Sequence, residues 1–242
     1  MTYSVIGRCP ETHELGIAIA TYSLACGSFA QGAHGGFGVA MTQANVRKGN
    51  AHLANKLLGL GYSSQSVVQA LVQDDVHESL RQIAVMTRDG RVAAHTGSTV
   101  AGWAGQKVGT HHVVFGNVLV GEQVLDAMAA GFCAEPGRPL VERLIQSLEH
   151  GRNAGGQGSA TLHMAERSAC VVVSGPQKPQ ALWDLRVDLH GTAVEELRRV
   201  YEAFAPYQRY YEDRDEDPSR CLSQVAWERD NLTETQLAEL LN

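Results

Sequence analysis

The chain of 242 residues lacks the features that mark several classes of protein. It has no apolar run long enough to cross a bilayer, and residues 1–8 lack the basic and then apolar pattern of a signal peptide. Charged residues make up only 19% and the net charge is −6, so no basic surface for nucleic acid or a membrane is indicated. We therefore expect a cytoplasmic protein with neither a nucleic-acid nor a membrane partner.

Cysteine is also scarce and scattered. The chain has five cysteines, an odd number without a C-x-x-C pair, which argues against a disulfide framework and against a zinc site. His111 and His112 are neighbours and would point to opposite faces of a strand, so they cannot easily bind one metal ion. The sequence therefore predicts neither a metal nor another cofactor.

What the chain does have is a sheet-forming start. Residues 2–8 and 14–21 alternate apolar side chains on either side of turn residues at 10–13, a pattern that predicts a β-hairpin. In the second run, large aliphatic side chains share one face and Gly or Ala the other. Methionine aminopeptidase can remove a Met that precedes a small hydroxyl residue, which would make Thr2 the N-terminal residue with both a hydroxyl and a free amine.

Further periodic runs predict strands and helices along the rest of the chain. Strands are expected at 37–44, 80–86, 91–96, 111–115, 159–164, 169–174 and 183–188, and helices at about 53–60, 64–72, 124–132, 140–148 and 193–204. Asp89 and Gly90 form the two-residue turn of a second hairpin. Runs of strands separated by pairs of helices favour antiparallel sheets covered by helices, so the expected fold class is α+β, a layered sandwich.

The hydrophobic content of 44% is enough for a real core, and the length fits one large domain, alone or with an appendage. The composition changes after residue 204, where tyrosines lead into charged residues at 212–218 that we interpret as a solvated segment. A capping box at Thr233 and Gln236 then predicts a short helix. We therefore predict a domain at 1–204 and a C-terminal segment at 205–242.

Several short motifs within residues 2–204 are specific only as a set. They are Thr2-Tyr3-Ser4-Val5, Pro10-Glu11-Thr12, Glu14-Leu15-Gly16, Thr42-Gln43-Ala44, Arg81-Gln82, Thr96-Gly97, Gly116-Asn117, Ala154-Gly155-Gly156, Ser159-Ala160 and Asp184-Leu185-Arg186-Val187-Asp188. With this set the chain resembles the DUF1028 family. The resemblance implies the fold of the N-terminal-nucleophile (Ntn) hydrolases, a four-layer αββα sandwich of two antiparallel sheets covered by helices.

The resemblance also implies a mechanism. In an Ntn hydrolase the hydroxyl of residue 2, here Thr2, attacks an amide, and the α-amine of the same residue accepts the proton and returns it to the leaving group. An α-amino pKa of about 7.7 to 8.0 lies close to working pH, as general base catalysis requires. Asn117 follows Gly116 at a strand end and is the candidate donor to the oxyanion. A small-molecule substrate is expected.

Four further residues are candidates for substrate binding. Ser4 would point the same way as the nucleophile, Thr42 and Gln43 end a core strand, and Asp188 ends a charged strand. Each has a structural alternative, which is packing for Ser4, an edge hydrogen bond for Thr42 and Gln43, and an ion-pair ladder for Asp188. Likewise, the nucleophile could be an ordinary strand residue behind a retained Met1.

Other functions stay open at this point. Where the family is expected to read G-G-D-x-R-G-x-Q-S-A, residues 155–160 read G-G-Q-G-S-A, so an acidic and a basic residue are missing from the expected site loop. A catalytically inactive protein that uses the fold for binding or assembly is the alternative to an amidohydrolase. A cell-wall-associated binding module that uses the aromatic and acidic tail is a third hypothesis. A homodimer is common for such sandwiches.

Overall fold

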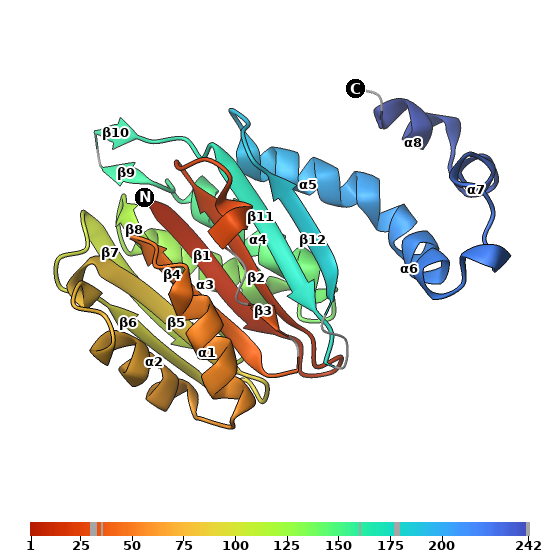
Figure 1. Ribbon diagram of the computed structural model, residues 1–242. Coiled ribbons are helices and arrows are strands. Elements are labelled where there is room, and N and C mark those ends of the chain that lie inside the picture. The colour runs from red at the N-terminus through yellow and green to blue at the C-terminus, as the bar shows by residue number, and fades with distance from the viewer. Residues whose placement is uncertain (30–32, 35, 160, 177–179, 241–242) are drawn as a thin grey trace. The chain divides into compact units, whose positions relative to one another are not determined.

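The strand that begins at Thr2 lies inside a six-stranded antiparallel sheet of the computed structural model (Figure 1). In sheet order the strands are β12 (Ala181–Val187), β11 (Ser168–Ser174), β2 (Leu15–Thr21), β1 (Thr2–Arg8), β8 (His112–Leu119) and β7 (Trp103–Gly109). The predicted N-terminal hairpin is confirmed as β1 and β2. The structure describes residues 1–29, 33–34, 36–159, 161–176 and 180–240, so Ala160 of the expected site loop lies outside the described residues.

Four strands form a second antiparallel sheet, in the order β3 (Ala33–His34), β4 (Gly38–Ala44), β5 (Arg81–Thr87) and β6 (Val92–Thr96). Asp89 and Gly90 turn the chain between β5 and β6, which confirms the second predicted hairpin. Gly90 has a φ of 89°, a value that glycine adopts without the steric penalty of other residues.

The two sheets share one apolar core. Ile6, Ile17 and Val113 of the first sheet belong to the same buried cluster as Met41 and Met86 of the second. Along each strand, alternate side chains therefore point into the space between the sheets, and the others point outward toward helices.

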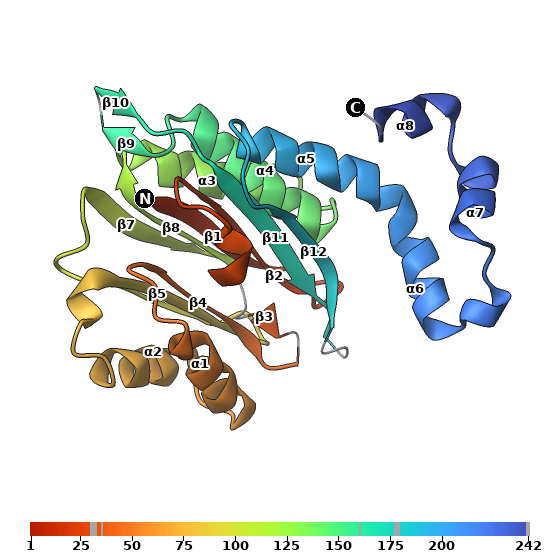
Figure 2. The ribbon, with the colours of Figure 1, turned by 45° about the horizontal axis from the view of Figure 1, so that its top comes forward.

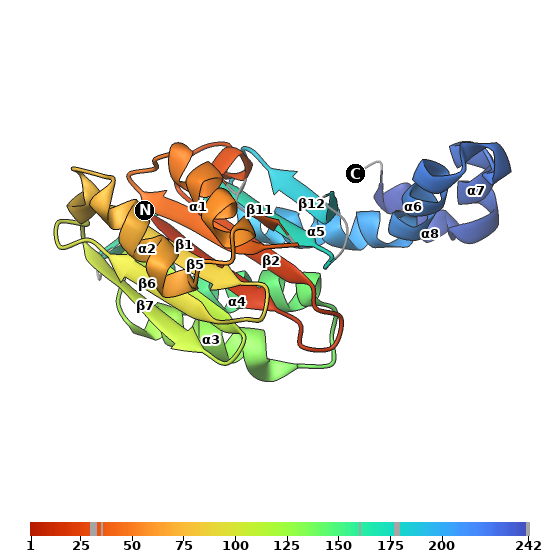
Figure 3. The ribbon, with the colours of Figure 1, turned by 60° about the horizontal axis from the view of Figure 1, so that its bottom comes forward.

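Helices cover the outward faces of both sheets (Figures 2 and 3). Leu71 of α2 packs with Ile83 on the second sheet, and α4 approaches the first sheet closely at Gly16, where an added Cβ would lie 2.6 Å from Leu144. These helices are α1 (Gly49–Gly59) and α2 (Ser64–Gln73) on the second sheet, and α3 (Gln123–Ala134) and α4 (Leu140–Asn153) on the first. The mixed α+β class with antiparallel sheets is confirmed.

By their contacts, residues 1–197 and 198–242 form two compact units. The division falls within α5 (Ala193–Phe204), whereas the sequence analysis placed the boundary after residue 204. Beyond α5 the chain contains α6 (Gln208–Glu216), α7 (Gln224–Asn231) and α8 (Glu234–Glu239). The capping box at Thr233 and Gln236 is confirmed. Among the helices of the described ranges, none has the length and apolar character needed to span a membrane.

Three elements differ from the sequence-based expectation. The edge strand β7 was not predicted, because its Gly, Gln and Lys residues are partly exposed and show no apolar alternation. The strand expected at 159–164 is instead a short ribbon of β9 (Gly158–Ser159) and β10 (Leu162–His163). No helix was predicted for the charged stretch at 212–218, which was interpreted as a solvated segment, yet most of it is helical. Pairs four residues apart, such as Arg209 with Asp213 at 2.7 Å, stabilise α6.

The close approach of α4 to β2 yields a test of this packing. Substitution Gly16→Ala should destabilise the fold by about 1 to 3 kcal/mol, because the new methyl group would overlap Leu144 and press on the carbonyl of Val172. Gly49→Ala at the start of α1 is the matched control, since a Cβ there meets nothing within 4 Å. The measurement is urea-induced unfolding, and equal midpoints for the two variants would contradict this packing.

Candidate functional site

The space between the sheets is apolar along most of its length and polar at the end where the chain begins. Thr2, Ser4 and Ile6 point into this space because they alternate along β1. Ile6 belongs to the apolar core, whereas Thr2 and Ser4 meet other polar side chains. The candidate site is this polar end.

Thr2 is held on both sides by strand pairing. It pairs with Thr21 on β2 and with Asn117 on β8, and it is only 8% exposed. Its Oγ1 lies 3.1 Å from Thr21 Oγ1, and the Thr21 hydroxyl donates to the carbonyl oxygen of Met1 at 2.6 Å. Because the Thr21 proton is engaged by Met1, the Thr2 hydroxyl is the donor in the contact between the two threonines.

A chain of side-chain hydrogen bonds crosses from one sheet to the other at this end. The Ser4 hydroxyl donates to Gln43 Oε1 at 2.6 Å. Gln43 Nε2 donates to Gln82 Oε1 at 3.0 Å, and Asn117 Nδ2 donates to the same oxygen at 2.9 Å. All four residues are buried. The structure thus brings together four of the predicted site residues: the nucleophile candidate and Asn117, Ser4 and Gln43.

Gln82 is the residue of this network that the sequence analysis did not propose for the site. Besides accepting two hydrogen bonds, its Nε2 donates to the carbonyl oxygen of Gly116 at 2.8 Å and to Thr96 Oγ1 at 3.1 Å. A signal was present in the sequence, since Gln82 alternates with Ala84 and Met86 of the shared core and therefore faces inward.

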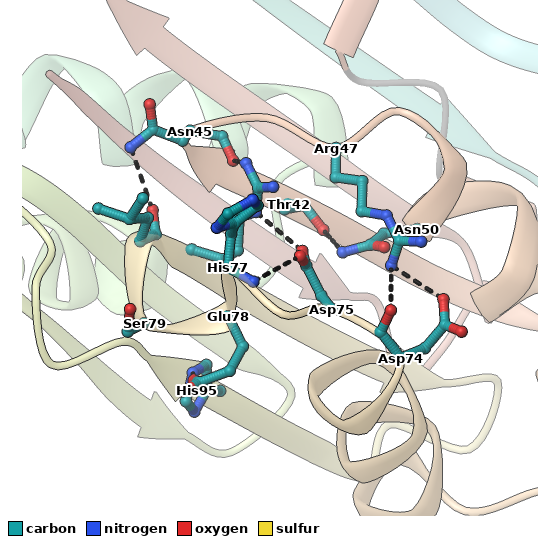
Figure 4. Close-up of polar contacts among 12 residues, drawn as sticks. Thr42, Asn45, Arg47, Asn50, Asp74, Asp75, His77, Glu78, Ser79 and His95 are labelled. Carbon is teal, nitrogen blue, oxygen red and sulfur yellow. Dashed lines mark hydrogen bonds and ion pairs between the residues drawn. The ribbon is translucent and has the colours of Figure 1, made fainter.

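Thr42 does not join the group. Neighbouring strand residues point to opposite faces, so Thr42 points outward where Gln43 points inward. Its Oγ1 accepts a hydrogen bond from Asn50 Nδ2 of α1 at 3.2 Å (Figure 4). Figure 4 places this contact beside Asp75, whose carboxylate binds Arg81 Nε at 2.9 Å.

Asp188 is also remote from the group. It follows the edge strand β12, which β11 and β2 separate from β1. Its side chain is exposed, and its backbone carbonyl accepts from the amide of Ala25 at 3.0 Å. The preceding charged residues Asp184 and Arg186 form an ion pair at 2.5 Å, in line with the structural alternative considered for this strand.

The side chains of the hydrogen-bond network at the polar end are neutral. The residues that contact one another there are hydroxyls and amides, namely Thr2, Ser4, Thr21, Gln43, Gln82 and Asn117. Burial lowers the pKa of the α-amine of Met1 below its ordinary value. Among the described residues, no group of three or more His, Cys, Asp or Glu side chains is placed to hold a metal ion.

The arrangement can therefore place a hydroxyl nucleophile next to neutral hydrogen-bond donors and acceptors. While Met1 is present, however, the backbone nitrogen of Thr2 is part of the peptide bond to Met1. A peptide nitrogen cannot act as a base. The chemistry of the site depends on whether the peptide bond between residues 1 and 2 is cleaved.

The chain is similar to other proteins over most of its length. The model of a protein family described as "Family of unknown function (DUF1028)" matches residues 2–197. The crystal structure of protein SPO2555 from Silicibacter pomeroyi, described with the same family model, is 26% identical, has a TM-score of 0.76, and covers 84% of this chain and 89% of its own. Anbu (ancestral beta-subunit) from Yersinia bercovieri is 12% identical with a TM-score of 0.33, over 87% of this chain and 97% of its own. No curated protein matches the chain.

The hydrogen bonds of Gln82 yield a stability prediction. Gln82→Leu should lower the free energy of unfolding by about 3 kcal/mol or more, because it leaves two buried amide donors and the Gly116 carbonyl without their partner, at about 1 to 3 kcal/mol for each group. Gln69→Leu on the exposed face of α2 is the matched control and should change stability little. Urea unfolding of both variants provides the measurement, and similar midpoints would contradict a structural role for the network.

Proposed function

The chain belongs to the DUF1028 family, and from this premise we propose that it is an Ntn amidohydrolase acting on a small amide, with Thr2 as nucleophile. The observation that carries the proposal is the position of Thr2 at the start of an inner strand, with its hydroxyl inside the polar end and 3.1 Å from Thr21 Oγ1. A residue with its hydroxyl and amine at the same buried strand end suits a mechanism in which attacker and base are one residue.

We also propose that the two sheets and their helices form the four-layer αββα sandwich of the Ntn hydrolases. Support comes from the shared core of the sheets and from the helix pairs packed on each outer face. In that architecture the first strand belongs to the inner layers, which is where β1 lies.

The proposed reaction starts after removal of Met1. The Thr2 hydroxyl oxygen forms a bond to the amide carbon, its proton passes to the α-amine of the same residue, and the carbonyl oxygen takes up the electron pair. When the C–N bond breaks, the amine returns the proton to the leaving nitrogen, and water then hydrolyses the threonine ester. Asn117, paired with Thr2 in register, is proposed as a donor near the oxyanion.

Burial at this end of the sheet favours the amine as a base. The pKa of the Met1 amine is already lowered by burial, and the amine of Thr2 lies further into the sheet. A lowered pKa leaves more of the amine neutral near pH 7, and only the neutral amine can accept the proton.

The neutral side chains of the network favour an uncharged substrate. Ser4 and Gln43 offer a hydroxyl and an amide at the polar end, and we propose them as substrate contacts. Thr42 and Asp188, which the structure places elsewhere, are not included in this proposal.

A protein that uses the fold for binding or assembly without chemistry is the second candidate. It is favoured by the hydrogen bond from Thr21 to the Met1 carbonyl, which holds the first residue in place, and by the low exposure of the Thr2 side chain. Intact-mass spectrometry of the protein from its native host separates the two. Quantitative retention of Met1 would favour the second candidate.

The proposed nucleophile can be tested without knowledge of the natural substrate. Protein that begins at Thr2, prepared by proteolytic removal of an N-terminal fusion, should react with 4-nitrophenyl acetate to give one acetyl ester on Thr2. Thr2→Ala should lower this rate by about 1,000-fold or more, whereas Thr2→Ser should retain activity. The measurement is intact mass after an acid quench, with hydroxylamine treatment to distinguish an ester from acetylated amines.

Protein that retains Met1 is the control for this experiment and should form no such ester, because its Thr2 nitrogen is part of a peptide bond. An unchanged yield of hydroxylamine-labile acetyl groups in Thr2→Ala would exclude Thr2 as the nucleophile.

The amine base predicts a specific pH dependence. Below the pKa of the Thr2 amine the base is protonated and cannot accept the hydroxyl proton, so the acylation rate should rise with pH and then level off. Because burial lowers the pKa of the amine at this end, the midpoint should lie below the ordinary α-amino range. Acylation rates measured between about pH 5 and pH 9, an interval that includes the ordinary α-amino pKa range, give this midpoint. A midpoint above the ordinary range would contradict a desolvated amine base.

A further inference from the structure

Gln157 lies in line with β1, just ahead of Thr2. β1 runs between β2 and β8, and the residue that follows β2 is Tyr22, whose backbone amide donates to Gln157 Oε1 at 3.0 Å. On the other side, Leu119 at the end of β8 forms a β-bridge with Gln157. Gln157 therefore connects the same two strands that flank β1, at the position of a strand residue upstream of Thr2.

One of the two polar atoms of the Gln157 side chain, Nε2, has no hydrogen-bond partner among the described residues. The side chain is fully buried, and although Oε1 accepts from Tyr22, Nε2 has no hydrogen-bond partner among the residues that the structure describes. A buried donor without a partner costs about 1 to 3 kcal/mol, and nearly all such groups in native proteins are satisfied. An amide with unused N–H groups thus lies where the proposed nucleophile begins.

The asparagine at this end is in a different situation. Asn117 Nδ2 already donates to Gln82 Oε1 at 2.9 Å, and that contact belongs to the network between the sheets. A donor to the substrate must give up or share any contact that it already makes, at a cost in free energy. Gln157 Nε2 has no such contact to lose within the described part of the chain.

We infer that Gln157 Nε2 donates a hydrogen bond to the carbonyl oxygen of the small carboxamide that Thr2 attacks. This inference rests on the proposed function. Met1 directly precedes Thr2, and the amide of Tyr22, the residue after the partner of Thr2 on β2, donates to Gln157 instead of to Met1. Removal of Met1 therefore frees space beside Thr2, at the end of β1 where Gln157 lies, for a substrate carbonyl. The ligand class is a compact amide, because the place to be filled is that of a single residue.

The bond to Gln157 strengthens during the reaction. As the Thr2 oxygen bonds to the carbonyl carbon, the electron pair of the C=O bond moves to the oxygen that faces Gln157 Nε2, and the hydroxyl proton passes to the α-amine. The pair returns when the C–N bond breaks and the leaving nitrogen takes that proton. A donor held in place by a second contact, here Oε1 with the Tyr22 amide, needs little reorganisation at that step.

Gln157→Glu tests the inference, because it keeps the oxygen that accepts from Tyr22 and replaces the NH₂ group by oxygen. In protein that begins at Thr2, the rate of acetyl-ester formation from 4-nitrophenyl acetate should fall by about 100-fold or more, the usual effect of losing one oxyanion donor. Gln69→Glu on the exposed face of α2 adds the same charge and should react at the wild-type rate. A wild-type rate in Gln157→Glu would overturn the inference.

A second measurement does not depend on the reaction or on the folding of a Gln157 variant. In ¹⁵N-labelled Thr2→Ala protein that begins at residue 2, the side-chain amide resonances of Gln157 should shift on titration with acetamide. They should not shift when Met1 is retained. Resonances that stay in place in the protein without Met1 would overturn the inference.

The two measurements separate this inference from the proposed function. Shifted resonances in a protein that forms no ester would leave the Gln157 contact standing and exclude the proposed amidohydrolase activity. Ester formation on Thr2 with unmoved resonances and an unaffected Gln157→Glu variant would support the proposed function and exclude Gln157 as the donor.

Discussion

The pairing of β1 with β2 on one side and β8 on the other is the constraint on which the rest of the structure depends. It buries the first strand at the start of the chain, and it sets Thr2 opposite Thr21 and Asn117. A shift of one residue in this register would turn every side chain of β1 to the other face. Ile6 would then leave the shared core, and Thr2 and Ser4 would face α4 instead of the second sheet.

The same register also gives the space between the sheets one apolar end and one polar end. Large aliphatic side chains fill one end, while hydroxyls and amides from both sheets fill the other. Buried amides destabilise a core unless their hydrogen bonds are made, and here Gln82 makes five such contacts, as acceptor from Gln43 and Asn117 and as donor to Thr96, Gly105 and Gly116. The network therefore joins the two sheets through side-chain hydrogen bonds at this end.

Part of the fold was predictable from the sequence. The N-terminal hairpin, the turn at Asp89 and Gly90 and the helix at Ala193–Phe204 follow from local periodicity and turn chemistry, and all three are present. The prediction that Thr42 and Gln43 both line the site conflicts with the same periodicity, because two neighbouring residues of a strand point to opposite faces. The edge strand β7 and the helix α6 escaped prediction because partly exposed, polar segments lack an apolar pattern.

By itself the sequence determined that Thr2 begins a strand and that its side chain shares a face with Ser4 and Ile6, because the alternation along a strand is local. Only the tertiary structure decided which groups meet at that face. Gln43, Gln82 and Asn117 come from distant parts of the chain, and their meeting depends on strand order and on sheet-to-sheet packing. Neither is encoded in the spacing of residues along one segment, so the unpaired amide of Gln157 becomes visible only once the strands on both sides of β1 are in place.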